Sequence, residues 1–214
     1  MMGIRGAIFD VDGTLLDSMP IWDGVAADYL RSRGCLPSPG LNDELRKLGG
    51  HQIPQYFQRE YGISETASEI HDAIGKLLED FYYNTAPLKD GVAQVLESLQ
   101  NKGVGMCVAT ATDRHLIEPA LQRCGIIGYF GRIFTCSEEK TSKSSPDIYL
   151  RAADFLGTSI SETLVFEDAL YAIRSAKKAG FPIVAVYDKS ADDQQDEIES
   201  LCDCYVKSLE DFCF

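Results

Sequence analysis

The 214 residues are enough for one large domain, or for one domain that carries a modest insertion. With 45% hydrophobic and 25% charged residues, the chain can form a core without disulfides or a structural metal. Its 33 acidic and 20 basic residues give a net charge of −13, which disfavours nucleic acids and anionic membranes as partners. A substrate that bears phosphate would therefore need positive charge supplied locally.

The start of the chain, MMGIRGAIFDVDG, has no apolar stretch of the signal-peptide kind, and no run elsewhere reaches the length of a membrane span. We therefore expect a cytoplasmic protein, which we also expect to be a monomer. The odd number of cysteines, seven, fits a reducing compartment. Cys202, Cys204 and Cys213 cluster near the end, but C-x-C without a nearby histidine is poor zinc spacing, which favours reduced thiols.

Short apolar runs alternate with amphipathic helical patterns along most of the chain. Strands are predicted over residues 6–9, 104–109, 132–134, 163–166, 183–186 and 205–206, and helices over 91–101, 116–124 and 148–156. Buried strands that alternate with helices are typical of a parallel sheet covered on both faces. The pattern therefore predicts an α/β fold with a doubly wound, Rossmann-like parallel sheet.

Residues 17–86 interrupt this alternation, because they contain helical patterns and no convincing strand. One helix is predicted over residues 20–33, with a proline suited to its first turn and Gly34 at its end. A second is predicted over residues 65–83, with Ser64 as its N-cap. We predict a helical cap domain over residues 17–86, inserted into a Rossmann-like catalytic core formed by residues 1–16 and 87–214.

The first predicted strand ends in Asp10-Val11-Asp12-Gly13-Thr14. In extended backbone Asp10 and Asp12 point the same way, and two close carboxylates need a cation or a shared proton. Gly13 and Thr14 allow a tight turn whose amides and hydroxyl could bind a phosphoryl oxygen. A bare D-x-D is more often an acidic turn, but DVDGT directly after an apolar strand favours a functional site.

A second acidic pair, Glu167 and Asp168, ends the predicted strand at 163–166 and opens a helix. Alone, such residues are more often N-caps, because acids stabilise helix N-termini. The carboxyl ends of parallel strands lie at one edge of a sheet, where open α/β folds bind ligands. Two acidic pairs at that edge favour a site for a hard cation with oxygen ligands, and Mg²⁺ is the obvious occupant.

Two further residues could supply positive charge and a hydroxyl group at the same edge. Lys143 precedes a proline and a helix, which would let it offset the carboxylates, although Lys140 is a local alternative. Thr110 closes the second predicted strand and is followed by Ala111. Its hydroxyl and the following helix amides could hold a phosphate, unless Thr110 is simply a cap.

In their order and placement these motifs resemble those of the haloacid dehalogenase superfamily, over essentially the whole chain. DVDGT matches its nucleophile motif, Thr110 its Ser/Thr position, Lys143 with PDIY its lysine motif, and FED its acidic metal motif. The helical insertion is similar to the cap of the branch that holds small phosphatases and β-phosphoglucomutase. PLKDGV resembles the segment that re-enters the core in that branch.

The resemblance implies that Asp10 attacks phosphorus and is transiently phosphorylated. It implies that Asp12 protonates the leaving oxygen and then activates water, while Thr110, Ala111 and Lys143 contact the phosphoryl group. The physical demands of phosphoryl transfer, which are positioning and neutralisation of charge, agree with this assignment.

For the metal, the resemblance implies Mg²⁺ bound by Asp10, by Asp12 through its backbone carbonyl, and by Asp168, with Glu167 nearby. The expected activity is a magnesium-dependent phosphatase that hydrolyses a small phosphomonoester, of the sugar-phosphate class. A dehalogenase is disfavoured, because that branch lacks the second aspartate and needs no metal.

Two other functions remain open. A phosphomutase of the β-phosphoglucomutase kind would carry a histidine near position 22 and an arginine after a cap glycine, whereas this chain has Trp22 and no matching arginine. Trp22 and His51 are candidate substrate contacts, with hinge packing and a surface position as the respective alternatives. A non-catalytic, phosphate-responsive module is the second alternative, although phospho-accepting receiver domains carry no such insertion.

Overall fold

A computed structural model describes residues 3–46, 48 and 52–213. The chain divides into two compact units, one formed by residues 1–19 and 86–214 and the other by residues 20–85. The first unit holds every described strand, and the second is helical. The role of residues 17–86 as a cap stays a prediction.

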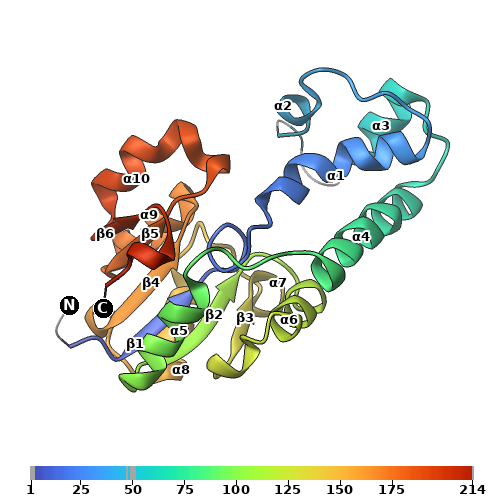
Figure 1. Ribbon diagram of the computed structural model, residues 1–214. Helices are drawn as coiled ribbons and strands as arrows, with labels where there is room; N and C mark the ends of the chain where they lie inside the picture. Colours follow the sequence, from blue (N-terminus) through green and yellow to red (C-terminus); the bar gives the residue numbers. More distant parts are fainter. Residues whose placement is uncertain (1–2, 47, 49–51, 214) are drawn as a thin grey trace. The chain divides into compact units, whose positions relative to one another are not determined.

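A parallel sheet forms the centre of the first unit (Figure 1). Its strands are β1 (Gly6–Phe9), β2 (Gly105–Thr110), β3 (Ile133–Thr135), β4 (Thr163–Glu167), β5 (Ile183–Val186) and β6 (Cys204–Val206). Their order in the sheet is β3-β2-β1-β4-β5-β6, and each neighbouring pair is parallel. The predicted doubly wound α/β fold is confirmed. The strand order reverses between β1 and β4, which is where such sheets bind ligands.

Helices cover both faces of this sheet (Figure 1). The helices of the first unit are α5 (Val92–Asn101), α6 (Arg114–Arg123), α7 (Cys136–Glu139), α8 (Asp147–Leu156), α9 (Leu170–Ala179) and α10 (Gln195–Leu201). Ile8 of β1 packs in one buried cluster with residues of α8 and α9. The next residue, Phe9, stacks on Phe166 of β4 with ring centroids 4.2 Å apart. Side chains alternate between faces along a strand, so each strand contributes to two cores.

The second unit has its own small core. Its helices are α1 (Met19–Ser32), α2 (Leu41–Arg46), α3 (Ile53–Tyr61) and α4 (Ala67–Asn84). Tyr29 of α1 is fully buried and stacks on Phe57 of α3 with ring centroids 5.4 Å apart. Its hydroxyl donates to Glu65 at 2.8 Å. Stacked aromatic rings with a satisfied hydroxyl group give this helical unit a hydrophobic centre separate from that of the sheet.

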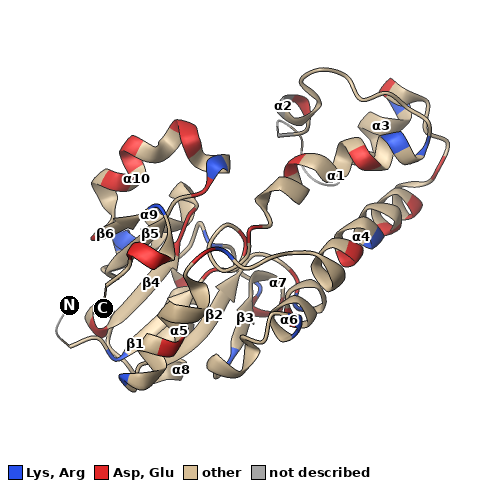
Figure 2. Cartoon of the chain, viewed as in Figure 1, with Lys and Arg blue, Asp and Glu red and all other residues tan. Residues whose placement is uncertain are grey.

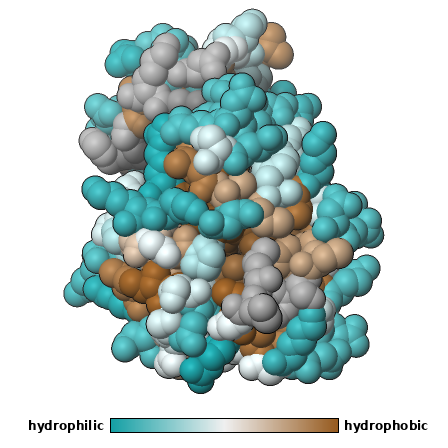
Figure 3. All heavy atoms as spheres, turned by 90° about the vertical axis from the view of Figure 1, so that its left-hand side faces the viewer, coloured by the Kyte–Doolittle hydropathy of each residue, from teal (hydrophilic) through white to brown (hydrophobic). Residues whose placement is uncertain are grey.

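Charge is spread over the surface helices. Figure 2 shows acidic residues along α4 and α10, and Figure 3 shows one face where hydrophilic residues surround smaller hydrophobic areas. Within the part of the chain that the structure describes, no helix combines the length and apolar character needed to cross a membrane.

The N-cap of α4 differs from the sequence prediction. The cap is Thr66 and not Ser64: the Thr66 hydroxyl accepts from the Glu69 N–H at 3.3 Å, and Glu69 Oε2 accepts from the Thr66 N–H at 2.7 Å. This reciprocal pair is a capping box, and it places the helix start two residues later. The T-x-x-E pattern formed by Thr66 and Glu69 is the sequence signature of a capping box.

Thr66→Ala should lower the free energy of unfolding of the helical unit by about 1 kcal/mol, because it leaves an N-terminal N–H of α4 unpaired. Ser64→Ala is the matched control and should change it by less than about 0.5 kcal/mol, since Ser64 is exposed and outside the cap. Urea unfolding followed by the fluorescence of Trp22, the single tryptophan, reports on this unit. Equal losses for both variants would contradict the assignment of the cap.

Candidate active site

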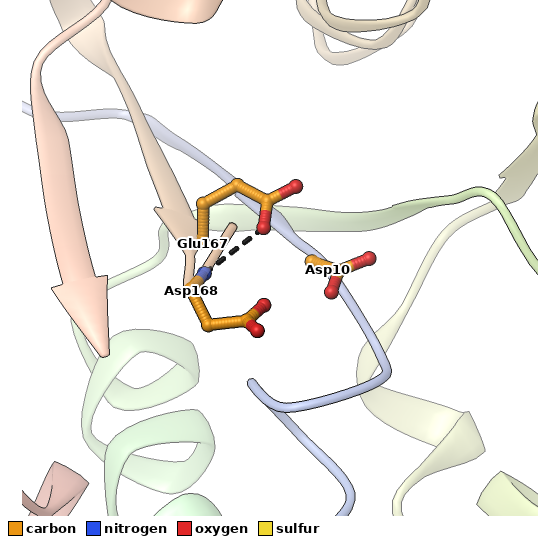
Figure 4. A group of neighbouring side chains, drawn as sticks. All are labelled: Asp10, Glu167 and Asp168. Atoms are coloured by element: carbon orange, nitrogen blue, oxygen red, sulfur yellow. Dashed lines mark hydrogen bonds between the residues drawn. The ribbon is translucent and has the colours of Figure 1, made fainter. Parts of the chain in front are cut away.

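Three buried carboxylates meet where the strand order reverses (Figure 4). Asp10 directly follows β1, Glu167 is the last residue of β4, and Asp168 comes next. The Asp10 N–H donates to the Phe166 carbonyl at 3.0 Å, which fixes the end of β1 beside β4. One oxygen from each carboxylate lies within 4.8 Å of the other two. The structure thus brings together Asp10, Glu167 and Asp168, as the sequence pattern suggested.

Lys143 provides the positive charge inside this cluster. Its side chain is 2% exposed, and its ammonium group donates to Asp10 Oδ1 and, at 2.5 Å, to Glu167 Oε1. Burial by itself would lower the pKa of Lys143, but the charges of Asp10 and Glu167 outweigh it and hold that pKa well above the ordinary value. Lys140, the alternative considered from sequence, is exposed and ends α7 with a φ of 52°.

Both carboxylate oxygens of Glu167 accept hydrogen bonds from the protein. Oε1 accepts from Lys143 and from the Tyr149 hydroxyl at 3.0 Å. Oε2 accepts from the backbone N–H groups of Asp168 at 2.9 Å and Ala169 at 3.4 Å. Glu167 therefore holds Lys143 in place and orients the chain at Asp168. Tyr149 was missed as a site residue in the sequence, although it is the tyrosine of PDIY.

The donor set fits a hard divalent cation. Among the described residues, none donates a hydrogen bond to Oδ2 of Asp10 or to Oδ2 of Asp168. Burial, followed by the charge of Glu167, raises the pKa of Asp10 to about 8, and the same two causes hold the pKa of Asp168 well above its ordinary value. One lysine does not neutralise three carboxylates, so a cation that prefers oxygen ligands, such as Mg²⁺, would relieve the remaining repulsion.

Residues 10–16 form the loop that follows β1, here called the β1 loop. This loop packs against Asp168. Gly13 has a φ of 83°, and a β-carbon there would collide with the Asp168 carboxylate, so this position requires glycine. Thr14 is fully buried, and its hydroxyl donates to Asp168 Oδ1 at 3.2 Å. The expectation that the Thr14 hydroxyl could bind a phosphoryl oxygen stays a prediction, and in this structure the hydroxyl orients Asp168.

Asp12 lies outside the cluster of three carboxylates. Its Oδ1 accepts from the Ser18 hydroxyl and its Oδ2 from the Thr112 hydroxyl, both at 2.6 Å. Any contribution of Asp12 to a metal site would therefore come from its backbone carbonyl. Sequence reasoning missed Ser18 and Thr112, because no local pattern indicates that their hydroxyl groups converge on one carboxylate.

The two residues expected to contact phosphate at the end of β2 have different environments. Thr110 is fully buried, and its hydroxyl oxygen accepts from the Thr112 N–H at 3.1 Å. Ala111 is exposed. Thr110 thus shapes the turn that leads into α6, and this turn also carries the Thr112 hydroxyl to Asp12.

The candidate substrate contacts in the helical unit are only partly described. Trp22 is 39% exposed, and its indole N–H donates to the Tyr82 hydroxyl at 3.0 Å. The two rings lie edge to face with centroids 6.5 Å apart, so Trp22 is anchored within its own unit while part of its ring stays exposed. His51 lies outside the described residues.

Known proteins are similar to this chain in sequence and in fold. A family model described as haloacid dehalogenase-like hydrolase matches residues 4–180. The chain is 26% identical over 210 residues to hexitol phosphatase B of Escherichia coli strain K12, covering 96% of this chain and 93% of that protein. It is 28% identical over 185 residues to fructose-1-phosphate phosphatase YqaB of the same strain, covering 85% and 95%.

Solved structures show the same fold. A candidate β-phosphoglucomutase from Thermotoga maritima superposes with a TM-score of 0.85 at 22% identity, over 97% of this chain and 96% of that chain. At this level of identity the likeness concerns the fold of the chain and says nothing of its substrate.

Lys143→Met should lower the free energy of unfolding by roughly 3–5 kcal/mol in the presence of a chelator, because it leaves buried carboxylates without their cation. Mg²⁺ should stabilise this variant, since it restores positive charge at the same place. Lys140→Met is the matched control and should stay within about 0.5 kcal/mol of the wild type, as expected for an exposed side chain. Urea unfolding with and without Mg²⁺ measures all three proteins. A Lys143→Met protein as stable in chelator as the wild type would contradict the role given to this lysine.

Proposed function

Because the chain belongs to the haloacid dehalogenase-like hydrolase family, we propose that it is a magnesium-dependent phosphatase that forms a phospho-aspartate on Asp10. Its substrate would be a small phosphomonoester of the sugar-phosphate class. The observation that carries the proposal is the buried cluster of Asp10, Glu167 and Asp168 around Lys143.

The cluster supports Asp10 as the nucleophile. One of its oxygens is held by Lys143, while Oδ2 accepts no hydrogen bond from the described residues and can face an incoming phosphorus atom. Attack would form a bond from this oxygen to phosphorus and break the bond from phosphorus to the ester oxygen. Magnesium, when bound, would neutralise charge on the phosphoryl oxygens.

We assign the proton transfers in both halves of the reaction to Asp12. It would donate a proton to the leaving ester oxygen and later take one from the water that attacks phospho-Asp10. The hydroxyl groups of Ser18 and Thr112 hold its carboxylate at 2.6 Å each, which supports a fixed orientation. Inorganic phosphate and the free alcohol would be the products.

The substrate class is supported by the relatives. Those named for hexitol phosphate and for fructose 1-phosphate chemistry each cover at least 85% of this chain. Trp22 offers a partly exposed aromatic ring, of the kind on which sugars stack. Trp22 and His51 remain proposed substrate contacts.

A phosphomutase is the alternative within the same family. It would retain the phospho-aspartate until a second sugar phosphate binds, which requires a cap that excludes water. Trp22 stands where the mutases would carry a histidine, and this favours hydrolysis. The second alternative, a non-catalytic phosphate-responsive module, is disfavoured because the chain retains the whole set of motifs, from DVDGT to FED.

Asp10→Asn should lower kcat by at least about a thousandfold and leave the fold intact, because the nearly isosteric carboxamide is not a nucleophile. Asp154→Asn, an exposed substitution in α8, is the matched control and should leave kcat unchanged. Phosphate release from a panel of sugar phosphates with Mg²⁺, together with circular dichroism, measures both effects. Retention of more than about a tenth of wild-type activity in Asp10→Asn would refute the nucleophile.

Hydrolysis and phosphomutation can be separated by following both products. With glucose 1-phosphate, with or without a bisphosphate activator, we expect free phosphate and no 6-phosphate isomer. Isomerised sugar phosphate forming faster than free phosphate would establish the phosphomutase instead.

Exhaustive chelation should abolish phosphate release, and Mg²⁺ should restore it. Full activity in chelator would exclude the role of the metal.

A further inference from the structure

Lys89 lies outside the acidic cluster but contacts the loop that shapes it. Its ammonium group donates to the Gly13 carbonyl at 2.7 Å, to the Tyr187 carbonyl at 2.6 Å and to Asp188 Oδ2 at 2.9 Å. The side chain is only 15% exposed, and that of Asp188 is 6% exposed. An ammonium group has three N–H donors, so these three protein acceptors use all of them.

The backbone also holds Lys89 beside the β1 loop. The Lys89 N–H donates to the Leu15 carbonyl at 3.0 Å, and Leu16 forms an isolated antiparallel bridge with Leu88. The segment by which the chain re-enters the first unit therefore runs alongside the β1 loop. Lys89 contacts that loop through both its main chain and its side chain.

The carbonyl that Lys89 binds belongs to the residue packed against Asp168. A β-carbon on Gly13 would collide with the Asp168 carboxylate, and Thr14 donates to Asp168 Oδ1 at 3.2 Å. The Gly13 carbonyl and the Thr14 N–H form one planar peptide unit. A cation that fixes this carbonyl therefore fixes the position of Thr14 relative to Asp168.

Asp188 is itself anchored on its other oxygen. Its Oδ1 accepts from the Ser190 N–H at 2.9 Å and from the Ser190 hydroxyl at 2.7 Å, which caps the short helix that follows β5. Lys89 thus links the β1 loop to a rigid turn after β5. It also neutralises Asp188, whose negative charge is felt by Asp168.

We propose that Lys89 is a positioning residue for the phosphoryl transfer, which holds the Gly13–Thr14 turn against Asp168 and so fixes the geometry of the carboxylate cluster. The inference rests on the proposed function, because it assigns Lys89 a part in that reaction. Lys89 has no N–H left for a substrate, so it acts through the β1 loop and does not bind phosphate.

The test compares the full-length wild type with Lys89→Met, which keeps the length of the side chain and removes the ammonium group. We expect kcat to fall by about 10- to 100-fold while KM changes by less than about threefold, because the loop shapes the reacting centre. Mn²⁺ alone serves as the metal probe, and electron paramagnetic resonance should show its dissociation constant rising about tenfold. A residue with a purely structural role would lower the melting temperature without changing these constants in the folded protein.

Lys177→Met is the matched control. Lys177 forms an ion pair with Asp203 at 2.7 Å, and Asp203 also accepts a backbone N–H, that of Ile183 at 2.8 Å. This substitution removes a lysine–aspartate ion pair on α9, with side chains 36% and 44% exposed, without touching the β1 loop. Its kcat and its affinity for Mn²⁺ should equal those of the wild type at a temperature where both proteins are folded.

A folded Lys89→Met protein with kcat and Mn²⁺ affinity within twofold of the wild type would overturn the proposal. Should Lys89→Met not fold, Lys89→Arg gives the same test, because a planar guanidinium keeps the charge but displaces the Gly13 carbonyl. If the wild type hydrolyses no phosphate ester while Lys89→Met still binds Mn²⁺ more weakly, the proposed function fails and the positioning of Asp168 by Lys89 is supported.

Discussion

Three buried carboxylates held around a single ammonium group are the constraint on which the rest of the site depends. One carboxylate oxygen from each of Asp10, Glu167 and Asp168 lies within 4.8 Å of the other two. The positive charge that contacts this cluster is the ammonium group of Lys143. Concentrating negative charge in a buried place is costly, and the surrounding residues reduce the cost through hydrogen bonds from Tyr149, Thr14 and the backbone. Under the proposed function, a divalent cation would relieve the remaining imbalance of charge.

The arrangement also explains how a protein with a net charge of −13 can accept an anionic substrate. Acidic residues lie along the outer helices α4 and α10, whereas Lys143 is buried within the cluster. Positive charge is therefore supplied at short range, where burial lowers the effective dielectric constant and strengthens each interaction. At long range, the net negative charge disfavours nucleic acids and anionic membranes as partners.

The conformation of the β1 loop, which depends on Gly13, positions Asp168 without adding a charged group to the site. Gly13 brings the β1 loop against Asp168, where any β-carbon would collide with the carboxylate. The loop is held from the other side by Lys89, which comes from the segment that returns from the helical unit. Lys89 belongs to the first unit and follows closely after the point where the chain re-enters it.

The sequence by itself determined the α/β class, the strand positions to within one or two residues, and the acidic residues Asp10, Glu167 and Asp168, because hydrophobic periodicity and strand ends are local signals. Only the tertiary structure decided the partners of those residues. Thr112 reaches Asp12 across 100 positions, and Lys89 reaches Asp188 across 99. Thr14 reaches Asp168 across 154 positions. Hydrogen-bond partners distant in the sequence depend on how strands pair in the sheet, and no local pattern encodes that pairing.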